Sequence, residues 1–352
     1  MKKILLVLVG GTICTSLNEH GTLSISEGAG VKLIENFKNS NSPFKDDVKI
    51  QPTENLFILS ENMSIPNWNL MLDTYRKYIN TEKFDGVIFA HGTDTLAFST
   101  SLFSLILANT NIPVFFVSSN ARLDSQRANG NENFKCAVEL ICQGIEPNVY
   151  ATYKNISDGR MYLHLGSRLL QCRNYSEDFF SYDAIDITEF SDETLEEIKE
   201  KYPKDEKSPL ININGDWHLE NNVLMITPYV GLDYSSFNYS KFSAILHGTY
   251  HSGTACTEPY NETSVLCLMD TCEKENPQID IYLSPSKNSG EIYDTVRVIG
   301  NHEANQKKIN FLYGYTNETA YAKLVLAYSI FKEKKDIENF INTQVNFEFF
   351  DK

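Results

Sequence analysis

The stretch Ile4-Leu5-Leu6-Val7-Leu8-Val9-Gly10-Gly11-Thr12-Ile13 decides the fold, because an unbroken apolar run leads directly into two glycines and a threonine. Such a run predicts a strand buried on both faces of a parallel sheet. A second stretch has the same design, with the apolar segment 86–90 followed by His91-Gly92-Thr93-Asp94-Thr95. Ligands bind beyond the carboxyl ends of the strands in open α/β sheets. Thr12, Thr93 and Asp94 are therefore expected at one edge of a sheet, where they favour nucleophilic catalysis over packing.

Strand and helix patterns alternate along the first half of the chain. Strands are expected at 4–9, 86–90, 113–117 and 148–153, and helices at 65–78, 95–109 and 133–143. Such alternation predicts a parallel sheet with right-handed crossover connections. The sequence therefore predicts an α/β fold whose larger N-terminal domain, residues 1–182, has a mostly parallel sheet flanked by helices.

The chain changes character after Tyr182. Residues 183–221 are rich in Asp, Glu and Lys, which predicts a charged linker with one helix at 192–201. Residues 222–352 resume the alternation and predict a smaller α/β C-terminal domain. Its strands are expected at 223–228, 242–247, 265–270, 279–283 and 295–298, and a helix at 319–331.

Composition narrows the possible partners and the compartment. The 352 residues carry a formal net charge of −15, which argues against nucleic-acid binding because that function needs a basic surface. The seven cysteines are scattered without a CxxC pair, so we expect no metal site and reduced thiols, as in the cytoplasm. No apolar run approaches the roughly 20 residues of a membrane span, and the apolar segment 4–9 is too short for a signal peptide.

Together the two threonine stretches resemble the signatures of the bacterial-type L-asparaginases, a family of threonine amidohydrolases. The similarity extends to Ser60-Glu61-Asn62-Met63-Ser64, to Ser118-Ser119-Asn120-Ala121-Arg122, and to Asn222-Val223-Leu224-Met225-Ile226-Thr227-Pro228-Tyr229. The last of these is most like the cytoplasmic, type I branch. The resemblance therefore runs nearly from end to end of the chain.

The resemblance implies a role for each matching residue. Thr12 would attack the amide carbonyl, while Thr93 and Asp94 would form a second catalytic group, with Asp94 also binding the substrate's α-amino group. Ser60 would bind the α-carboxylate beside Glu61, and the backbone at Gly11 and Gly92 would contact the substrate. The substrate would be a small-molecule amino-acid amide, no cofactor would be needed, and the protein would form a homodimer or homotetramer.

Two positions depart from the family pattern. The family has a lysine shortly after a glycine–arginine segment. Asp158-Gly159-Arg160 matches that segment, but the lysine position holds His164, with Lys154 and Arg168 nearby as substitutes. The family also has a tyrosine in the flexible loop after the first threonine. Its place falls at Thr22, so Tyr250 or Tyr293 would have to supply a phenol.

Simpler readings exist for these residues, and more than one function stays open. Gly-Gly-Thr can be an ordinary turn, Asp94 or Thr95 can cap the helix that follows, and His164 can be a buried structural histidine. The favoured function is hydrolysis of L-asparagine to L-aspartate and ammonia through an acyl-enzyme on Thr12. The alternatives are an amidohydrolase for glutamine or a modified amide, and a catalytically weak relative that binds an amino acid.

Overall fold

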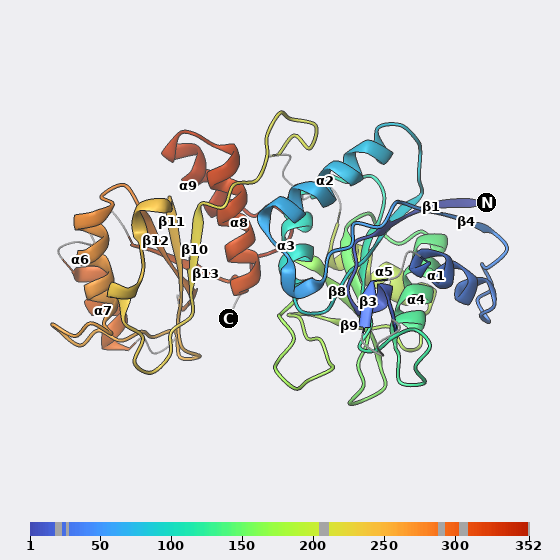
Figure 1. The fold of residues 1–352 in the computed structure, drawn as a ribbon, viewed down its shortest axis with the longest axis horizontal. Helices are drawn as coiled ribbons and strands as arrows, with labels where there is room; N and C mark the ends of the chain where they lie inside the picture. Colours follow the sequence, from blue (N-terminus) through green and yellow to red (C-terminus); the bar gives the residue numbers. More distant parts are fainter. Residues whose placement is uncertain (18–22, 26–27, 204–210, 288–292, 303–308, 351–352) are drawn as a thin grey trace. The chain divides into compact units, whose positions relative to one another are not determined.

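The computed structural model describes residues 1–17, 23–25, 28–203, 211–287, 293–302 and 309–350, and its chain divides into two compact units. Unit 1 comprises Met1–Asp216 with Val345–Phe347, and unit 2 comprises Trp217–Gln344 with Glu348–Lys352. Both units are α/β, and the N-terminal unit is the larger, as the sequence predicts (Figure 1).

Unit 1 is built on one mostly parallel sheet. In spatial order its strands are β4 (Val48–Pro52), β1 (Lys2–Leu8), β5 (Gly86–Ala90), β6 (Val114–Val117), β7 (Val149–Lys154), β8 (Met161–Leu165) and β9 (Ile185–Asp186). The strands from β4 to β7 are parallel, and β8 and β9 are antiparallel additions at one edge. The expected runs at 4–9, 86–90, 113–117 and 148–153 are thus confirmed as neighbouring strands.

Helices cover both faces of this sheet (Figure 1). On one face α1 (Ala29–Lys38) packs on α4 (Gly130–Gln143), with the Phe37 and Phe134 rings 6.2 Å apart. On the other face α2 (Ile65–Ile79) and α3 (Leu96–Ile106) lie side by side, and the Trp68 indole donates a hydrogen bond to Ser99 Oγ. The strands between them are completely buried, which explains their continuous apolar sequences.

The crossover connections do not all have the same hand. Strands β5, β6 and β7 follow one another across the sheet, yet α3 joins the first pair on one face and α4 joins the second pair on the other. Two crossovers that advance in the same direction on opposite faces must have opposite hands. The expectation of uniformly right-handed connections is therefore wrong for one of them.

The expected linker at 183–221 is only partly a linker. It contains β9, which pairs with β8, and α5 (Asp192–Lys201), whose N-cap Ser191 forms a capping box with Thr194. Residues 211–216 also belong to unit 1. The Arg76 guanidinium donates through Nε to Ile213 O at 2.7 Å, and Asn80 Nδ2 donates to Asn214 Oδ1 at 3.1 Å.

Unit 2 has a parallel sheet of β10 (Val223–Ile226), β11 (Ala244–Gly248), β12 (Asp280–Ser286) and β13 (Ile309–Tyr313). Helices α6 (Val265–Glu275) and α7 (Asp294–Asn301) lie on one side, and α8 (Asn317–Ile330), which packs against α9 (Lys334–Asn342), lies on the other (Figure 1). The expected strands at 265–270 and 295–298 are therefore wrong, because both segments are helical.

Candidate active site

The two threonine loops leave the sheet where its connections diverge. Strands β1 and β5 are neighbours, but the chain after β1 leads to α1 on one face while the chain after β5 leads to α3 on the other. Neighbouring strands whose helices lie on opposite faces define a topological switch point, where α/β sheets open a crevice for ligands. The sheet thus delivers Thr12 and Thr93 to the place where a ligand is expected.

Three loops meet at this edge in direct contact. Gly11 has a φ of 74°, and a methyl group on it would lie 2.1 Å from the Gly92 Cα. A methyl group on Gly92 would lie 2.4 Å from the Ser60 Cβ. Gly10 pairs with Ile58 in an isolated β-bridge, and the Gly11 N–H donates to Ile58 O at 3.2 Å. Glycines at 11 and 92 are thus required by the close approach of the three loops.

We expect Gly11→Ala to abolish the activity of this site while Gly144→Ala leaves it unchanged. The new methyl at position 11 would push the Thr12 loop away from the Thr93 loop, and small displacements of reacting groups cost about a hundredfold in rate. Gly144 is also at positive φ but has no atom within 4 Å of the added methyl, so it controls for backbone strain. Steady-state turnover and circular dichroism of both variants measure the effect. Equal activities would show that contact between the loops is not needed.

Thr93 and Asp94 line a cavity of about 460 Å³. Its wall also includes Asn120 after β6, Tyr153 of β7 and the segment 171–177. Asp94 is exposed, and its carboxylate makes no hydrogen bond or ion pair with the residues that the structure describes, so it is available to an ammonium group. Thr12 is half-buried in the 3-10 turn Thr12–Cys14, outside the wall of this cavity but in the loop that touches Gly92.

A family model described as Asparaginase, N-terminal, matches residues 3–201, which is more than half of the chain. The chain belongs to the asparaginase family. Within it, the chain is 25% identical over 253 residues to one of the glutamyl-tRNA(Gln) amidotransferase subunits of Thermoplasma volcanium, covering 70% of this chain and 59% of that protein. The protein of the same name from Halobacterium salinarum is 34% identical over 123 residues, covering 35% and 28%. The chain thus spans less than two thirds of the length of these relatives.

Solved asparaginase structures share the fold from end to end. The thermostable L-asparaginase from Thermococcus kodakarensis superimposes with a TM-score of 0.71 at 19% identity, covering 99% of this chain and 100% of that one. L-asparaginase I from Vibrio cholerae gives 0.70 at 19% identity, covering 99% of both chains. A probable cytoplasmic L-asparaginase from Campylobacter jejuni gives 0.66 at 15% identity, covering 98% and 100%.

Ser60 lies in the contact of the three loops but not in the wall of the cavity. Its side chain is buried, and its Oγ accepts the Thr95 N–H at 3.1 Å and lies 3.1 Å from the Thr95 hydroxyl. Thr95 is the N-cap residue of α3, but its side chain makes no capping hydrogen bond. Its hydroxyl instead donates to the Ser60 carbonyl. Glu61 is exposed and also lies outside the cavity wall. In this structure Ser60 joins two loops, and its proposed contact with a substrate carboxylate stays a prediction.

The structure does not bring His164 into the cavity with Thr93. The His164 ring is buried in β8, and its Nδ1 pairs with Ser181 Oγ at 2.9 Å. Burial lowers the pKa of this imidazole to about 3. The two substitutes are engaged elsewhere, because Lys154 pairs with Glu132 at 2.8 Å and Arg168 pairs with Asp183. A base role for His164 therefore gains no support from the geometry.

Gln171 is a cavity side chain that sequence reasoning missed. It lines the cavity beside Thr93, and its Nε2 donates a hydrogen bond to the Asp94 carbonyl. The signal was a second glycine–arginine segment, Gly166-Ser167-Arg168, which stands three residues before Gln171. Gln171 thus occupies the place next to Thr93 that the sequence pattern assigned to His164.

The buried histidines predict a destabilisation in acid. With an unfolded pKa near 6.5 and a folded pKa of about 3, His164 adds no pH dependence above pH 6.5 and costs about 1.4 kcal/mol of stability per pH unit below it. Burial also lowers the pKa of His91, in unit 1, to about 4. We expect the free energy of unfolding of His164→Gln to fall less steeply between pH 6.5 and 5 than that of the wild type, by about 2 kcal/mol in total.

Urea unfolding at pH 7, 6 and 5 measures this difference. His251→Gln, at an exposed position, is the control and is expected to retain the wild-type dependence on pH. If His164→Gln also retained the wild-type dependence, the His164 imidazole would not be held neutral in the folded chain.

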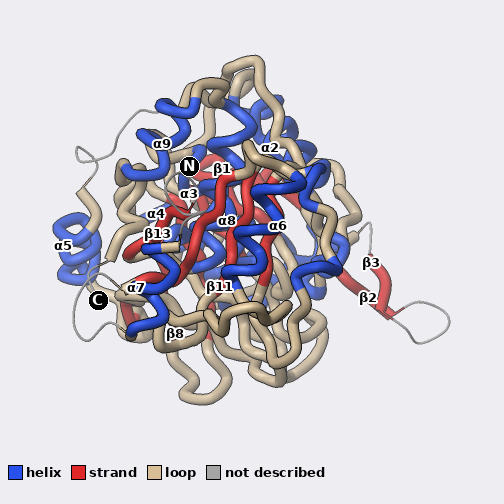
Figure 2. The backbone as a smooth tube through the Cα atoms, turned by 90° about the vertical axis from the view of Figure 1, so that its left-hand side faces the viewer, coloured by secondary structure: helices blue, strands red, loops and turns tan. Residues whose placement is uncertain are grey.

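The sequence places the family's loop tyrosine at Thr22 and offers Tyr250 or Tyr293 as substitutes. Thr22, the position of the family's loop tyrosine, lies outside the described residues, between the strands β2 (Thr15–Leu17) and β3 (Leu23–Ile25), whose hairpin projects in Figure 2. Tyr250 and Tyr293 are exposed residues of unit 2.

Across the described ranges, no helix is long and apolar enough to cross a membrane, and no group of His, Cys, Asp and Glu could hold a metal ion.

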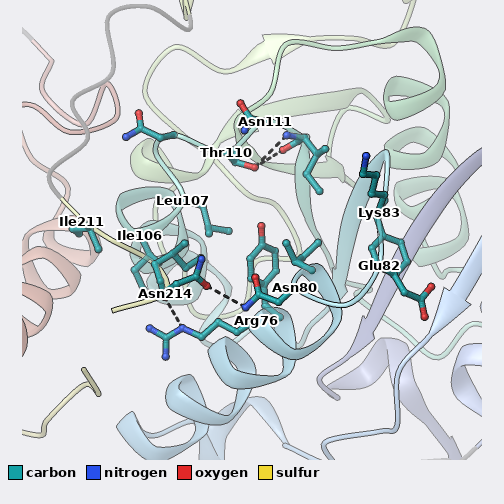
Figure 3. Close-up of a pocket in the computed structure, with 16 residues that line it drawn as sticks. Arg76, Asn80, Glu82, Lys83, Ile106, Leu107, Thr110, Asn111, Ile211 and Asn214 are labelled. Atoms are coloured by element: carbon teal, nitrogen blue, oxygen red, sulfur yellow. Dashed lines mark hydrogen bonds between the residues drawn. The ribbon is translucent and has the colours of Figure 1, made fainter. Parts of the chain in front are cut away.

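A second cavity, of about 390 Å³, lies at the edge of the unit 1 sheet opposite to the Thr93 loop. The end of α2, the residues before β5 and the residues after α3 form its wall (Figure 3). None of the predicted site residues lines this cavity. These segments mark the amino end of β5, opposite to the Thr93 loop. We therefore place the candidate active site at the carboxyl edge alone.

Proposed function

We propose that the chain is an amidohydrolase that converts L-asparagine to L-aspartate and ammonia through a threonine acyl-enzyme. The supporting observation is the contact of the Thr12 and Thr93 loops through Gly11 and Gly92 at the switch point of the sheet. Membership of the asparaginase family agrees with this reaction class.

In the proposed reaction Thr12 Oγ attacks the side-chain amide carbon, and its proton passes to the amide nitrogen. The C–N bond then breaks and ammonia leaves, so that an ester links the acyl group to Thr12. Water attacks this ester, which releases the acid and restores the hydroxyl. Asp94 holds the substrate's ammonium group during both steps. The Gly11 N–H is committed to Ile58 O, so the donors that stabilise the oxyanion must lie elsewhere, on the backbone near Thr12 or Gly92.

Two observations keep alternative functions in view. The curated relatives are named as subunits of an amidotransferase, which favours an amide substrate other than free asparagine. Gln171, a neutral side chain, stands beside Thr93 where a base is wanted, which favours a catalytically weak protein that binds an amino acid. We also propose that the protein works in a reducing cytoplasm, since its seven cysteines form no disulfide, and that it forms a homodimer or homotetramer, as the family resemblance implies.

Ammonia release from a small panel of amides separates these functions. The panel comprises L-asparagine, L-glutamine and α-N-acetyl-L-asparagine. The proposal expects the highest kcat/KM with asparagine. Preference for glutamine or for the blocked amine would indicate a different amidohydrolase. Absence of ammonia from every amide, together with calorimetric binding of L-aspartate, would indicate the binding protein.

A further inference from the structure

Three residues from the C-terminal part of the chain, Val345–Phe347, belong to unit 1, although the chain before and after them belongs to unit 2. We call them the returning segment. Their side chains are buried, and the Phe347 ring joins the core of unit 1, 5.5 Å from the ring of Tyr202. Phe347 has a φ of 56°, a left-handed conformation that a residue with a side chain keeps only where its surroundings enforce it. Contacts within unit 1 therefore determine the conformation of this segment.

The side chain of Asn346 ties the returning segment to two elements of unit 1. Its Nδ2 donates to Ser104 O of α3 at 2.9 Å and to Asn148 Oδ1, directly before β7, at 2.8 Å. All three residues are buried. Both hydrogens of one amide group are thus used to fix a single position between α3 and β7.

The backbone of the returning segment in turn holds the 3-10 turn Gly166–Arg168, which follows β8. Ser167 Oγ donates to Asn346 O at 2.7 Å, and Arg168 Nε donates to Phe347 O at 2.5 Å. Asn346 therefore fixes the turn through its own carbonyl, while its amide group fixes it to α3 and β7.

From this turn the chain runs along α3 to the cavity. A methyl group on Gly166 would lie 2.4 Å from Ser104 Oγ, and Ser101 Oγ donates to Gly166 O at 3.3 Å, so the turn packs directly on α3. Five residues later Gln171 lines the cavity and donates to the carbonyl of Asp94, which stands just before α3. Residues 166–171 thus lead from the returning segment to the cavity wall beside Thr93.

This stretch is also held on the side away from α3. The Leu170 N–H donates to Phe180 O at 2.9 Å, and the Tyr182 N–H donates to Arg168 O at 3.3 Å. A short extended stretch that is bonded along its length cannot absorb a displacement of the turn by bending. A shift of the turn is therefore passed on to Gln171 and to the Asp94 peptide.

We propose that the returning segment positions the active site, with Asn346 as the positioning residue. Asn346 touches no reacting atom, but its hydrogen bonds fix the turn Gly166–Arg168 and, through it, the contact of Gln171 with the Asp94 peptide. Thr93 and Asp94 are adjacent in the chain, so a shift of this peptide moves both. Displacements of about 1 Å at reacting groups cost about a hundredfold in rate. The proposal rests on the amide hydrolysis proposed above.

The activity test compares Asn346→Ala with the wild type, using L-asparagine at a temperature where circular dichroism shows both to be folded. We expect kcat to fall about tenfold or more while KM changes less than about threefold. The chemical step slows because the reacting groups are misaligned, whereas the exposed Asp94 carboxylate still reaches the substrate's ammonium group. An unchanged kcat in the folded variant would overturn the proposal.

Asn276→Ala is the matched control for lost stability. The Asn276 Nδ2 likewise donates two hydrogen bonds, to Tyr239 O at 3.0 Å and to Phe242 O at 2.9 Å, but within unit 2. We expect this variant to lower the urea midpoint of unfolding and to keep the wild-type kcat. Equal losses of kcat in Asn276→Ala and Asn346→Ala would contradict a specific role of Asn346.

Ser167→Ala tests the same route from the other side and decides the question if Asn346→Ala does not fold. It removes only the bond from the turn to Asn346 O, so kcat should fall about threefold or more. The double variant should lose little more activity than Asn346→Ala alone, since both residues act on one turn. Losses that multiply, or an unchanged kcat in Ser167→Ala, would contradict the proposal.

Hydrogen–deuterium exchange measured by mass spectrometry tests the positioning without any substrate. Backbone amides of residues 168–182 should exchange at least about tenfold faster in Asn346→Ala than in the wild type, and at the wild-type rate in Asn276→Ala. Unchanged exchange in this range would overturn the proposal even if kcat fell. Failure of the proposed hydrolysis would appear separately, as absence of ammonia with the wild type, and exchange alone would then decide whether Asn346 holds the cavity wall.

Discussion

Replacement of Thr12 by alanine is expected to lower kcat for amide hydrolysis by at least about a thousandfold, because an enzyme without its nucleophile keeps only binding and oxyanion stabilisation. Thr12 is half-buried in a short 3-10 turn, and its hydroxyl has no hydrogen bond to the described residues, so the variant should fold as the wild type does. Ammonia release under saturating substrate measures kcat, and circular dichroism checks the fold.

Two further variants sharpen this result. Thr12→Ser keeps a hydroxyl and should retain measurable turnover. Thr74→Ala removes a half-buried threonine of α2 whose hydroxyl donates to the Leu70 carbonyl of the same helix, and should leave kcat unchanged. Turnover of Thr12→Ala above a few per cent of the wild-type value would mean that another group attacks the amide.

Asp94→Ala is expected to raise KM for L-asparagine by about 10- to 100-fold or more, because it removes the unpaired carboxylate of the cavity wall that balances the substrate's ammonium group. Asp94→Asn should have a smaller effect, since its amide oxygen still accepts a hydrogen bond. Steady-state kinetics of the two variants and of Asp73→Ala, an exposed carboxylate of α2, give the comparison.

α-N-acetyl-L-asparagine provides the decisive control for Asp94. The wild type should prefer free asparagine, and Asp94→Ala should lose that preference because the acetylated compound has no ammonium to bind. If the wild type preferred the acetylated amide, Asp94 would not bind an ammonium and the substrate class would be different.

The central strands of unit 1 could be predicted from the sequence because burial on both faces of the sheet determines which residues they contain. Strands β1 and β5 are buried on both faces, so each appears as an unbroken apolar run that ends at a glycine and a threonine. Helix α5 was found to the residue, since Ser191 and Thr194 cap it through their own side chains. A short apolar run, by contrast, does not by itself distinguish a buried strand from a helix. The segment at 265–270 has the same composition as a buried strand, but Ser264 caps it and residues 265, 268, 269 and 272 are buried at helical spacing.

The candidate site was predictable where it lies next to the strands and not where tertiary contacts decide it. Thr12, Thr93 and Asp94 directly follow β1 and β5, so their edge of the sheet followed from the chain itself. Gln171 and Arg173 reach the cavity on a loop that follows an antiparallel strand, β8, and the one local signal for that loop is the segment Gly166-Ser167-Arg168 before it. His164 lies within β8 itself, where strand pairing with Ala151 buries its ring.

Peptide mapping of the acid-quenched enzyme during turnover of L-asparagine tests the central claim most directly. Cleavage after lysine and arginine places Thr12 in the peptide 4–32 and Thr93 in the peptide 84–122, so the two threonines separate cleanly. The acyl-enzyme mechanism predicts a β-aspartyl group on the peptide 4–32, located at Thr12 by fragmentation and absent from Thr12→Ala. An aspartyl group on the peptide 84–122, or sustained ammonia release with neither peptide acylated, would contradict the assignment of Thr12 as the nucleophile.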